Sequence, residues 1–182
     1  MHKTNNELTK ISIGLHWLVG ISIIILMTVG WYMKTYEDLS LYPIHKSIGV
    51  IIFVFILIRV FRRIKRGWPT PVSKYKSHEI LLSKLVHWVL ILGTLLFPIS
   101  GMMMSGAGGH GIAVFGLELV ASNYSAAGEA IPLNGQLAGI GHEVHEYLLW
   151  VMLVAIVLHI AGAWKHHLVD KDNTLKRMLG KS

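Results

Sequence analysis

The sequence contains no cysteine among its 182 residues. This absence excludes disulfide frameworks, zinc–thiolate sites, iron–sulfur clusters, c-type haem attachment and a cysteine nucleophile. Charge is also scarce: 15% of the residues are Asp, Glu, Lys or Arg, whereas soluble domains carry roughly 25%. Hydrophobic residues make up 53% of the chain, and the mean hydropathy is +0.53. This composition is typical of a membrane protein.

Acidic residues are the rarer charged class, with 10 Asp and Glu against 17 Lys and Arg. The resulting net charge of +7 is compatible with nucleic-acid binding. However, the basic residues lie in short blocks between long apolar runs, without an interleaved aromatic stripe. We therefore expect no nucleic-acid partner and take the lipid bilayer as the environment of the chain.

Long runs without charged residues predict the membrane spans. A hydrocarbon core of ~30 Å requires about 20 helical residues. Three runs contain no Asp, Glu, Lys or Arg, and a fourth contains only Lys46. The expected fold is an all-α membrane protein, a four-transmembrane-helix up-down bundle in a single domain over residues 1–182. Its helices are expected at about 12–33, 44–64, 80–104 and 143–165. The first span is too long for a signal-peptide core.

The distribution of Lys and Arg predicts the orientation of these spans. Fifteen of the 17 basic residues lie before the first span, between the second and third, or after the fourth. Only Lys34 and Lys46 lie in the other two connections. Inner loops carry the excess of Lys and Arg, so both termini and the connection between the second and third spans are expected inside.

The long outer connection, residues 105–142, is rich in glycine and has no Lys or Arg. Its run 106–111 predicts a turn-rich segment leaving the membrane, and residues 115–120 predict a short interfacial piece. Pro98 and Gly101 predict a kink or a local widening in the third helix.

Histidines are abundant, with eleven in the chain, and four of them fall at matching depths. His145 and His159 are 14 residues apart, so they project from nearly one face of the fourth helix, about 21 Å apart along its axis. His16 lies level with His159 near the inner surface, and His45 lies level with His145 near the outer surface. Two level pairs, one above the other in a bundle, predict two haem b groups with these imidazoles as iron ligands.

Two further residues fit this interpretation. Arg59 follows His45 by 14 residues, so it shares that face at the inner depth and is a candidate partner for a haem propionate. Gly30 follows His16 by the same interval, where a missing side chain leaves room for the outer macrocycle. The alternatives are a snorkelling Arg59 at the membrane surface and close helix packing at Gly30 and at Gly49.

Other histidines leave alternatives open. Any single histidine in a span is also compatible with an interhelical hydrogen bond or a proton relay. His87 is the rival of His16 as an inner ligand, or else belongs to a propionate, proton or quinone environment. His142 lies ~100° off the face of His159, so His145 is preferred. His110 is expected in a loop, and His166 and His167 are expected at the interface.

At this point the residues resemble the bacterial cytochrome b561 family. The matching pieces are Ile-Gly-Leu-His-Trp-Leu (13–18), His45 with Ser-Ile-Gly (47–49), Leu-Ile-Arg-Val (57–60), Val-His-Trp (86–88), His145, His159 and the tail 165–178. The resemblance covers nearly the whole chain. It implies four helices, two bis-histidine b haems and electron transfer between a donor and the quinone pool, with ubiquinone or menaquinone as substrate. It carries over His16 and His159 for the inner haem, and His45 and His145 for the outer haem.

One kind of protein in that family is a superoxide oxidase, which passes electrons from superoxide to ubiquinone. The outer segments of this chain disfavour capture of an anion, because Lys34 and Lys46 face six acidic residues there: Glu37, Asp38, Glu118, Glu129, Glu143 and Glu146. A second alternative is a cytochrome b anchor for a dehydrogenase or hydrogenase, with such a redox protein as partner. A third is a haem-free proton or metal transporter that uses the histidines as a relay.

Overall fold

A computed structural model describes residues 9–181 of the chain. Lys3, which contributes to the charge bias above, lies outside these residues. The long helices are α1 (Lys10–Tyr36), α2 (Tyr42–Arg66), α3 (Ser77–Ala107) and α4 (Gly135–Leu168). Shorter elements join or follow them: η1 (Leu39–Leu41), β1 (Ile112–Val114), β2 (Leu117–Val120) and α5 (Thr174–Met178).

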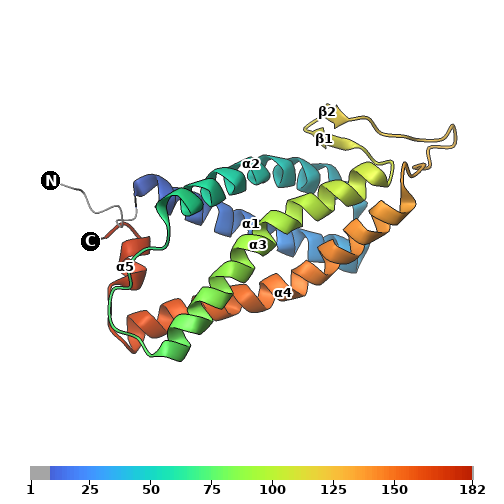
Figure 1. The fold of residues 1–182 in the computed structure, drawn as a ribbon. Helices are drawn as coiled ribbons and strands as arrows, with labels where there is room; N and C mark the ends of the chain where they lie inside the picture. The colour runs from blue at the N-terminus through green and yellow to red at the C-terminus, as the bar shows by residue number, and fades with distance from the viewer. Residues whose placement is uncertain (1–8, 182) are drawn as a thin grey trace.

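The four long helices run up and down beside one another, with α1 against α2 and α3 against α4 (Figure 1). One end of the bundle holds the start of α1, the 67–76 connection and α5 (Figure 1). We call it the terminal end. The opposite end holds the β1–β2 hairpin, and we call it the hairpin end. These correspond to the predicted inner and outer sides.

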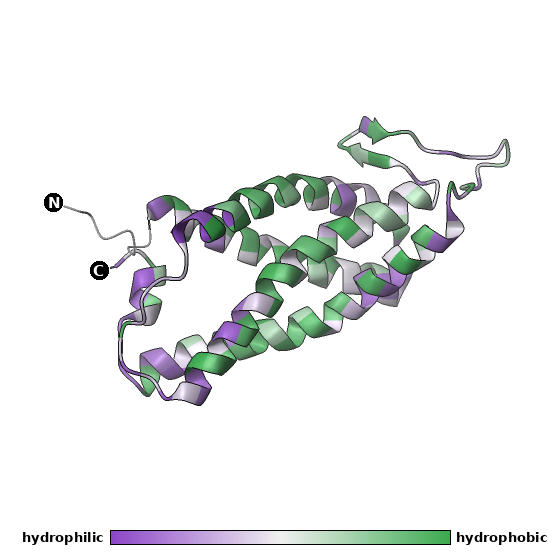
Figure 2. Cartoon of the chain, in the orientation of Figure 1, coloured by the Kyte–Doolittle hydropathy of each residue, from purple (hydrophilic) through white to green (hydrophobic). Residues whose placement is uncertain are grey.

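All four long helices are apolar and long enough to cross a membrane. Hydrophobic residues dominate their middle parts, and hydrophilic residues gather toward the two ends of the bundle (Figure 2). Large apolar side chains at mid-helix are exposed, such as Ile25 at 54% and Val154 at 60%. In water such a surface would be costly, but in a bilayer it contacts lipid tails. The predicted all-α four-span fold is thus confirmed.

The helices are longer than their uncharged runs indicate. Helix α4 begins at Gly135, well before the expected residue 143, and Asn134 caps it by accepting a hydrogen bond from Leu137 N at 3.0 Å. With 34 residues, α4 is ~51 Å long, which exceeds the ~30 Å hydrocarbon core. Counting uncharged residues misses helical turns that continue among the headgroups.

The connection between α3 and α4 contains more structure than expected. The predicted turn is present, with positive φ at Gly109 and Gly111. The predicted short piece is the second half of an antiparallel hairpin, in which Val114 pairs with Leu117. Its two-residue loop, Phe115–Gly116, has positive φ at both positions, as type I′ turns require. Helix α3 continues through Pro98 and Gly101, so neither residue ends it.

A small core joins the helices. Its buried members come from all four helices: Val19, Ile23, Leu26, Ile52, Ile56, Phe97 and Met152. Helices α3 and α4 approach closely near the hairpin end, because Gly141 has no side chain. A Cβ there would lie 2.7 Å from Met104 N and 2.9 Å from Ser100 O. This close approach fixes where α4 presents its histidines to the neighbouring helices.

Candidate functional site

Two histidines face each other near the hairpin end. His45 lies in the second turn of α2, and His145 lies in α4. Their ring centroids are 6.4 Å apart, and the ring planes are inclined by 76°. The sequence placed these two residues level on the outer side, and the structure brings them together.

A second pair lies toward the terminal end. His16 on α1 faces His159 on α4, with ring centroids 6.0 Å apart and ring planes inclined by 62°. His159 comes from the same helix as His145, so α4 supplies one imidazole to each pair. The two pairs therefore lie one above the other along the bundle, as the 14-residue interval predicts.

Both separations suit an ion held between two imidazoles. A metal–nitrogen bond of about 2.0 Å on each side, plus about 1.1 Å from each nitrogen to its ring centre, gives about 6.2 Å between centroids. The measured 6.4 Å and 6.0 Å agree with that value. Edge-to-face rings in contact also have centroids about 4.5–7 Å apart, so these separations accommodate an ion without requiring one. The four histidines thus fit two metal centres with bis-imidazole ligation.

Hydrogen bonds fix the tautomer of His145. Its Nδ1 lies 3.0 Å from the carbonyl oxygen of Phe97 and 3.0 Å from Ser100 Oγ. A carbonyl only accepts, so Nδ1 carries the proton and donates it. The lone pair is then on Nε2, the atom that remains for a metal. Such a bond to a backbone carbonyl is common behind metal-binding histidines.

His45 contributes a different signal. Its Nδ1 is buried and has no hydrogen-bond partner within residues 9–181. Buried polar atoms without a partner are rare and require an explanation. We note that the ring is also close to Gly30, where a Cβ would lie 3.5 Å from His45 Cε1. Gly30 thus lies at the predicted outer depth, next to His45 of the His45–His145 pair.

Gly101 has the corresponding place beside His145. A Cβ at Gly101 would lie 3.1 Å from His145 Cε1 and 3.4 Å from His145 Nδ1. That approach is tighter than most real contacts, so a side chain would displace the ring. The sequence singled out Gly101 for helix shape, and the structure shows that it gives space to an imidazole.

His87 on α3 is near the terminal-end pair but is held differently. Its Nδ1 donates to the Ser83 carbonyl oxygen at 2.6 Å, and its ring contacts Trp68 at 5.7 Å. The His87 and His159 ring centroids are only 5.0 Å apart, with the planes at 89°. This is edge-to-face contact between rings, too close for an ion on the line between them. The separation therefore favours His16 as the partner of His159.

Arg59 lies where its spacing placed it, beside the terminal-end pair. Its Nη2 is 3.3 Å from His16 Nδ1. A guanidinium only donates, so Nδ1 accepts this bond and the proton of His16 is on Nε2; ligation of a metal by that Nε2 requires Arg59 to release Nδ1. Among residues 9–181, every ion pair involves other groups, so no carboxylate neutralises Arg59. A partly buried cation without an anion fits an acidic group of a ligand at this place.

His142 and His110 lie outside the two pairs. His142 lies 3.5 Å from Glu146, which also pairs with Lys34 on α1. His110, in the loop as expected, contacts Tyr124, with the His110 Nδ1 and the Tyr124 hydroxyl 3.4 Å apart. Lys46 Nζ donates to Ser105 Oγ at 3.0 Å and to the His110 carbonyl oxygen at 3.3 Å.

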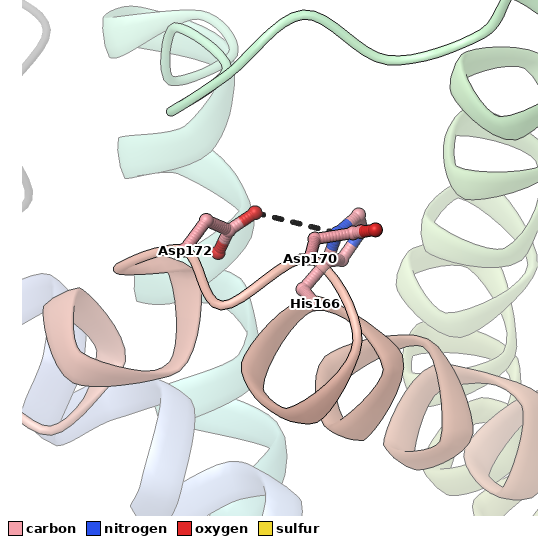
Figure 3. A group of neighbouring side chains, drawn as sticks. All are labelled: His166, Asp170 and Asp172. Carbon is pink, nitrogen blue, oxygen red and sulfur yellow. Dashed lines mark hydrogen bonds and ion pairs between the residues drawn. The ribbon is translucent and has the colours of Figure 1, made fainter.

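His166 takes part in a polar cluster at the terminal end that the sequence did not reveal. Its Nδ1 is 2.8 Å from Asp170 Oδ2 and 3.5 Å from Asp172 Oδ2 (Figure 3). Lys165 Nζ bonds the same Asp170 oxygen at 2.9 Å, and Tyr75 Oη donates to Asp172 at 2.5 Å. The Lys165 ammonium group already supplies the positive charge that a metal ion would bring to these carboxylates. The cluster therefore links the 67–76 connection to the C-terminal tail.

The two aspartates of this cluster have lowered pKa values. Hydrogen bonding from Lys165 holds the pKa of Asp170 below its ordinary value, with His166 adding to the effect. Burial alone would raise the pKa of Asp172, but hydrogen bonds from Tyr75 and Thr174 outweigh it and lower that pKa. Both carboxylates are therefore stabilised in the charged form.

The fold and site define a class: a multi-pass helical membrane protein with paired imidazoles in its bundle core. Comparison with known families agrees. The family model described as prokaryotic cytochrome b561 matches residues 7–181. The chain belongs to this family. It is thus a bacterial membrane b-type cytochrome, and membership implies haem b binding and electron transport.

Curated relatives align with nearly the full chain. Cytochrome b561 homolog 2 of Escherichia coli (strain K12) is 36% identical, covering 94% of this chain and 90% of the relative. Probable superoxide oxidase CybB of Yersinia pestis is 30% identical, covering 100% of this chain and 98% of the relative. Cytochrome b561 homolog 1 of Escherichia coli (strain K12) is 24% identical over similar shares, 96% and 97%.

Proposed function

We propose that the chain binds two haem b groups and transfers electrons between a donor and the quinone pool. One group lies between His45 and His145, and the other between His16 and His159. The observation that supports this most is the pair of ring separations, 6.4 Å and 6.0 Å, which suit bis-imidazole ligation. When bound, haem b supplies one-electron redox chemistry.

The residues around each pair have distinct proposed roles. Phe97 O and Ser100 Oγ bond His145 Nδ1 and so leave Nε2 for the iron. Gly30 and Gly101 leave space beside the two rings of that pair. Arg59 supplies a positive charge to a propionate at the terminal-end pair. If both imidazoles of each pair hold an iron, they would favour outer-sphere electron transfer over oxygen activation.

The proposed setting is the bacterial inner membrane, with the terminal end in the cytoplasm. The Lys and Arg bias supports this orientation, because the two connections at the hairpin end contain only Lys34 and Lys46. The proposed acceptor or donor in the membrane is ubiquinone or menaquinone. His87, half-buried against Trp68 beside the terminal-end pair, is a candidate member of the proton or quinone environment there.

Superoxide is the second candidate for the donor. The 30% identical relative named as a probable superoxide oxidase favours it. The contacts at the hairpin end disfavour superoxide as the donor, because Lys34 is paired with Glu146 and Lys46 is bonded to Ser105 and the His110 carbonyl oxygen. The ion pair neutralises Lys34, while Lys46 keeps its charge but is outnumbered by the acidic residues of the outer segments. A redox protein that docks on the 105–142 segment is the remaining kind of donor.

The proposal is tested by measuring haem per chain in the detergent-purified protein and recording its reduced-minus-oxidised spectrum. Two b-type haems per chain, oxidised by a soluble ubiquinone or menaquinone analogue, are expected. A folded protein that stays colourless after expression with added haem would favour a histidine relay instead. For the donor, generated superoxide should reduce the haems faster than it decays if superoxide is the substrate.

A further inference from the structure

Basic side chains line a pocket at the terminal end of α2. Arg62, Lys65 and Arg66 form it together with Phe61, and its volume is about 290 Å³. Phe61 and Lys65 are separated by one helical turn, as are Arg62 and Arg66, so all four share one face of the helix. The pocket therefore brings three cationic side chains and one aromatic ring to a single place.

These cations have no anionic partner in the part of the chain that the structure describes. The ion pairs at this end belong to Lys165 and His166, with Glu79, Asp170 and Asp172. Arg62 is anchored on one side, where its Nη2 donates to Thr9 Oγ1 at 3.1 Å. Its Nε is buried and unpartnered. A buried guanidinium N–H without an acceptor is unfavourable, so Arg62 gains from an anion in the pocket if a rotation of its side chain brings this N–H within reach.

The same face borders the apolar part of the membrane. Phe61 is 66% exposed and the neighbouring Ile64 is 75% exposed. Helix α2 ends one residue after Lys65, at Arg66, and Gly67 caps it with a φ of +69°. The pocket thus lies where a membrane helix leaves the hydrocarbon. An occupant that touches both the cations and Phe61 has a negative headgroup and an acyl chain.

We propose that this pocket binds the headgroup of an acidic phospholipid in the leaflet at the terminal end. Arg62 and Arg66 donate to its phosphate oxygens, Lys65 adds charge, and Phe61 contacts the first part of a chain. Clusters of basic residues at this depth favour anionic headgroups. The partial negative charge at the C-terminus of α2 opposes binding. It amounts to about half a charge, against three full positive charges, and Arg63 already donates to the Gly67 carbonyl oxygen.

The test is native mass spectrometry of the delipidated full-length protein in detergent. Dioleoylphosphatidylglycerol is titrated against the protein, with dioleoylphosphatidylcholine and inorganic phosphate as separate arms. One phosphatidylglycerol per chain is expected to bind at least about fivefold more tightly than phosphatidylcholine. The double variant Lys65→Gln, Arg66→Gln is expected to lose most of this preference. The matched control Lys74→Gln, Lys181→Gln removes the same charge outside the pocket and should keep it.

Three results would overturn the proposal. Equal losses in both double variants would mean that general charge, not the pocket, selects the lipid. Equal binding of phosphatidylcholine would remove the role of the negative headgroup. Inorganic phosphate that displaces the lipid at matching concentration would assign the pocket to a soluble anion. Circular dichroism of each variant before the titration checks that the helices are intact, and the measurement does not depend on haem occupancy.

Discussion

His145 on α4 donates from Nδ1 to the carbonyl oxygen of Phe97 on α3, at 3.0 Å. This bond joins a side chain and a backbone oxygen 48 residues apart. It fixes the tautomer of the imidazole, so that the lone pair is on Nε2, and it restrains the rotation of the ring. A metal site needs this kind of support behind its ligands, because an imidazole that is free to turn binds less tightly. Helix α3 therefore positions a histidine of the hairpin-end pair although it contributes no histidine to that pair.

Gly101 tests whether the space beside His145 matters. A Cβ would already be 3.1 Å from His145 Cε1, so we expect Gly101→Val to displace the ring and remove about one of two haems per chain. Haem quantification and the difference spectrum provide the measurement. Gly139→Val, on exposed backbone of α4 with nothing within 4 Å of a Cβ, is the control. Full haem content in the Gly101 variant would contradict the role assigned to this glycine.

His87 and His16 compete for the place opposite His159. Because the His87 and His159 rings are in contact at 5.0 Å, we expect His87→Ala to keep both haems. His16→Ala should lose one of the two. The same haem count per chain decides between them. Loss of a haem from the His87 variant, together with retention in the His16 variant, would exchange the two assignments.

Arg59 should affect the reduction potential of the haem at the terminal-end pair. A unit charge acting over about 8 Å at an effective dielectric constant of about 20 contributes about 2 kcal/mol. For one electron this is about 90 mV, since a tenfold change corresponds to about 59 mV. Losing a positive charge favours the oxidised iron, so Arg59→Gln should lower one potential by about 50–100 mV.

Redox titration followed by absorbance measures this shift. Arg59→Lys keeps the charge and should shift the potential less, while Lys74→Gln, on the exposed connection, should leave it unchanged. A potential that stays constant in Arg59→Gln would show that Arg59 acts only as a cation at the membrane surface.

Acid should release the tail from the terminal end. The pKa values of Asp170 and Asp172 are lower in the folded protein than in the unfolded chain. Their contribution to stability is therefore complete above the unfolded-state pKa of about 3.9. It is lost as the pH falls through their folded-state pKa values. The chain lacks cysteine, so a spin label on Lys181→Cys reports this region alone. Its mobility should rise as pH falls below about 4.

The variant Asp172→Asn should raise that mobility already at neutral pH, because it removes the charge and one of the two oxygens that accept from Tyr75 Oη and Thr174 N. Asp38→Asn, at the hairpin end, serves as the control. A label whose mobility follows neither pH nor the Asp172 substitution would show that other contacts, such as Trp17 Nε1 to the Met178 carbonyl oxygen at 2.7 Å, hold the tail alone.

Much of the fold was predictable because the membrane imposes a simple rule. Uncharged runs of about 20 residues have few alternatives to a spanning helix. The interval of 14 residues between His145 and His159 predicts one helical face, and the structure shows His45 and His16 opposite these two. Their role as iron ligands stays a prediction.

The rest depends on features that residue spacing does not encode. Phe97 acts through its backbone oxygen, which every residue has, so no pattern marks it. Ser100 is one of many serines, and only the packing of α3 against α4 brings it to His145. The tie between Tyr75 and Asp172 joins segments 97 residues apart. Such contacts arise from helix packing and turn geometry.

The central claim is that the four histidines form two independent pairs of iron ligands. The most direct measurement is haem per chain, with difference spectra, in two double variants: His45→Ala with His145→Ala, and His16→Ala with His159→Ala. His110→Ala with His142→Ala is the matched control. The account predicts two haems in the wild-type chain and the control, and one haem in each double variant, with different spectra. Two haems retained in either double variant would contradict the account.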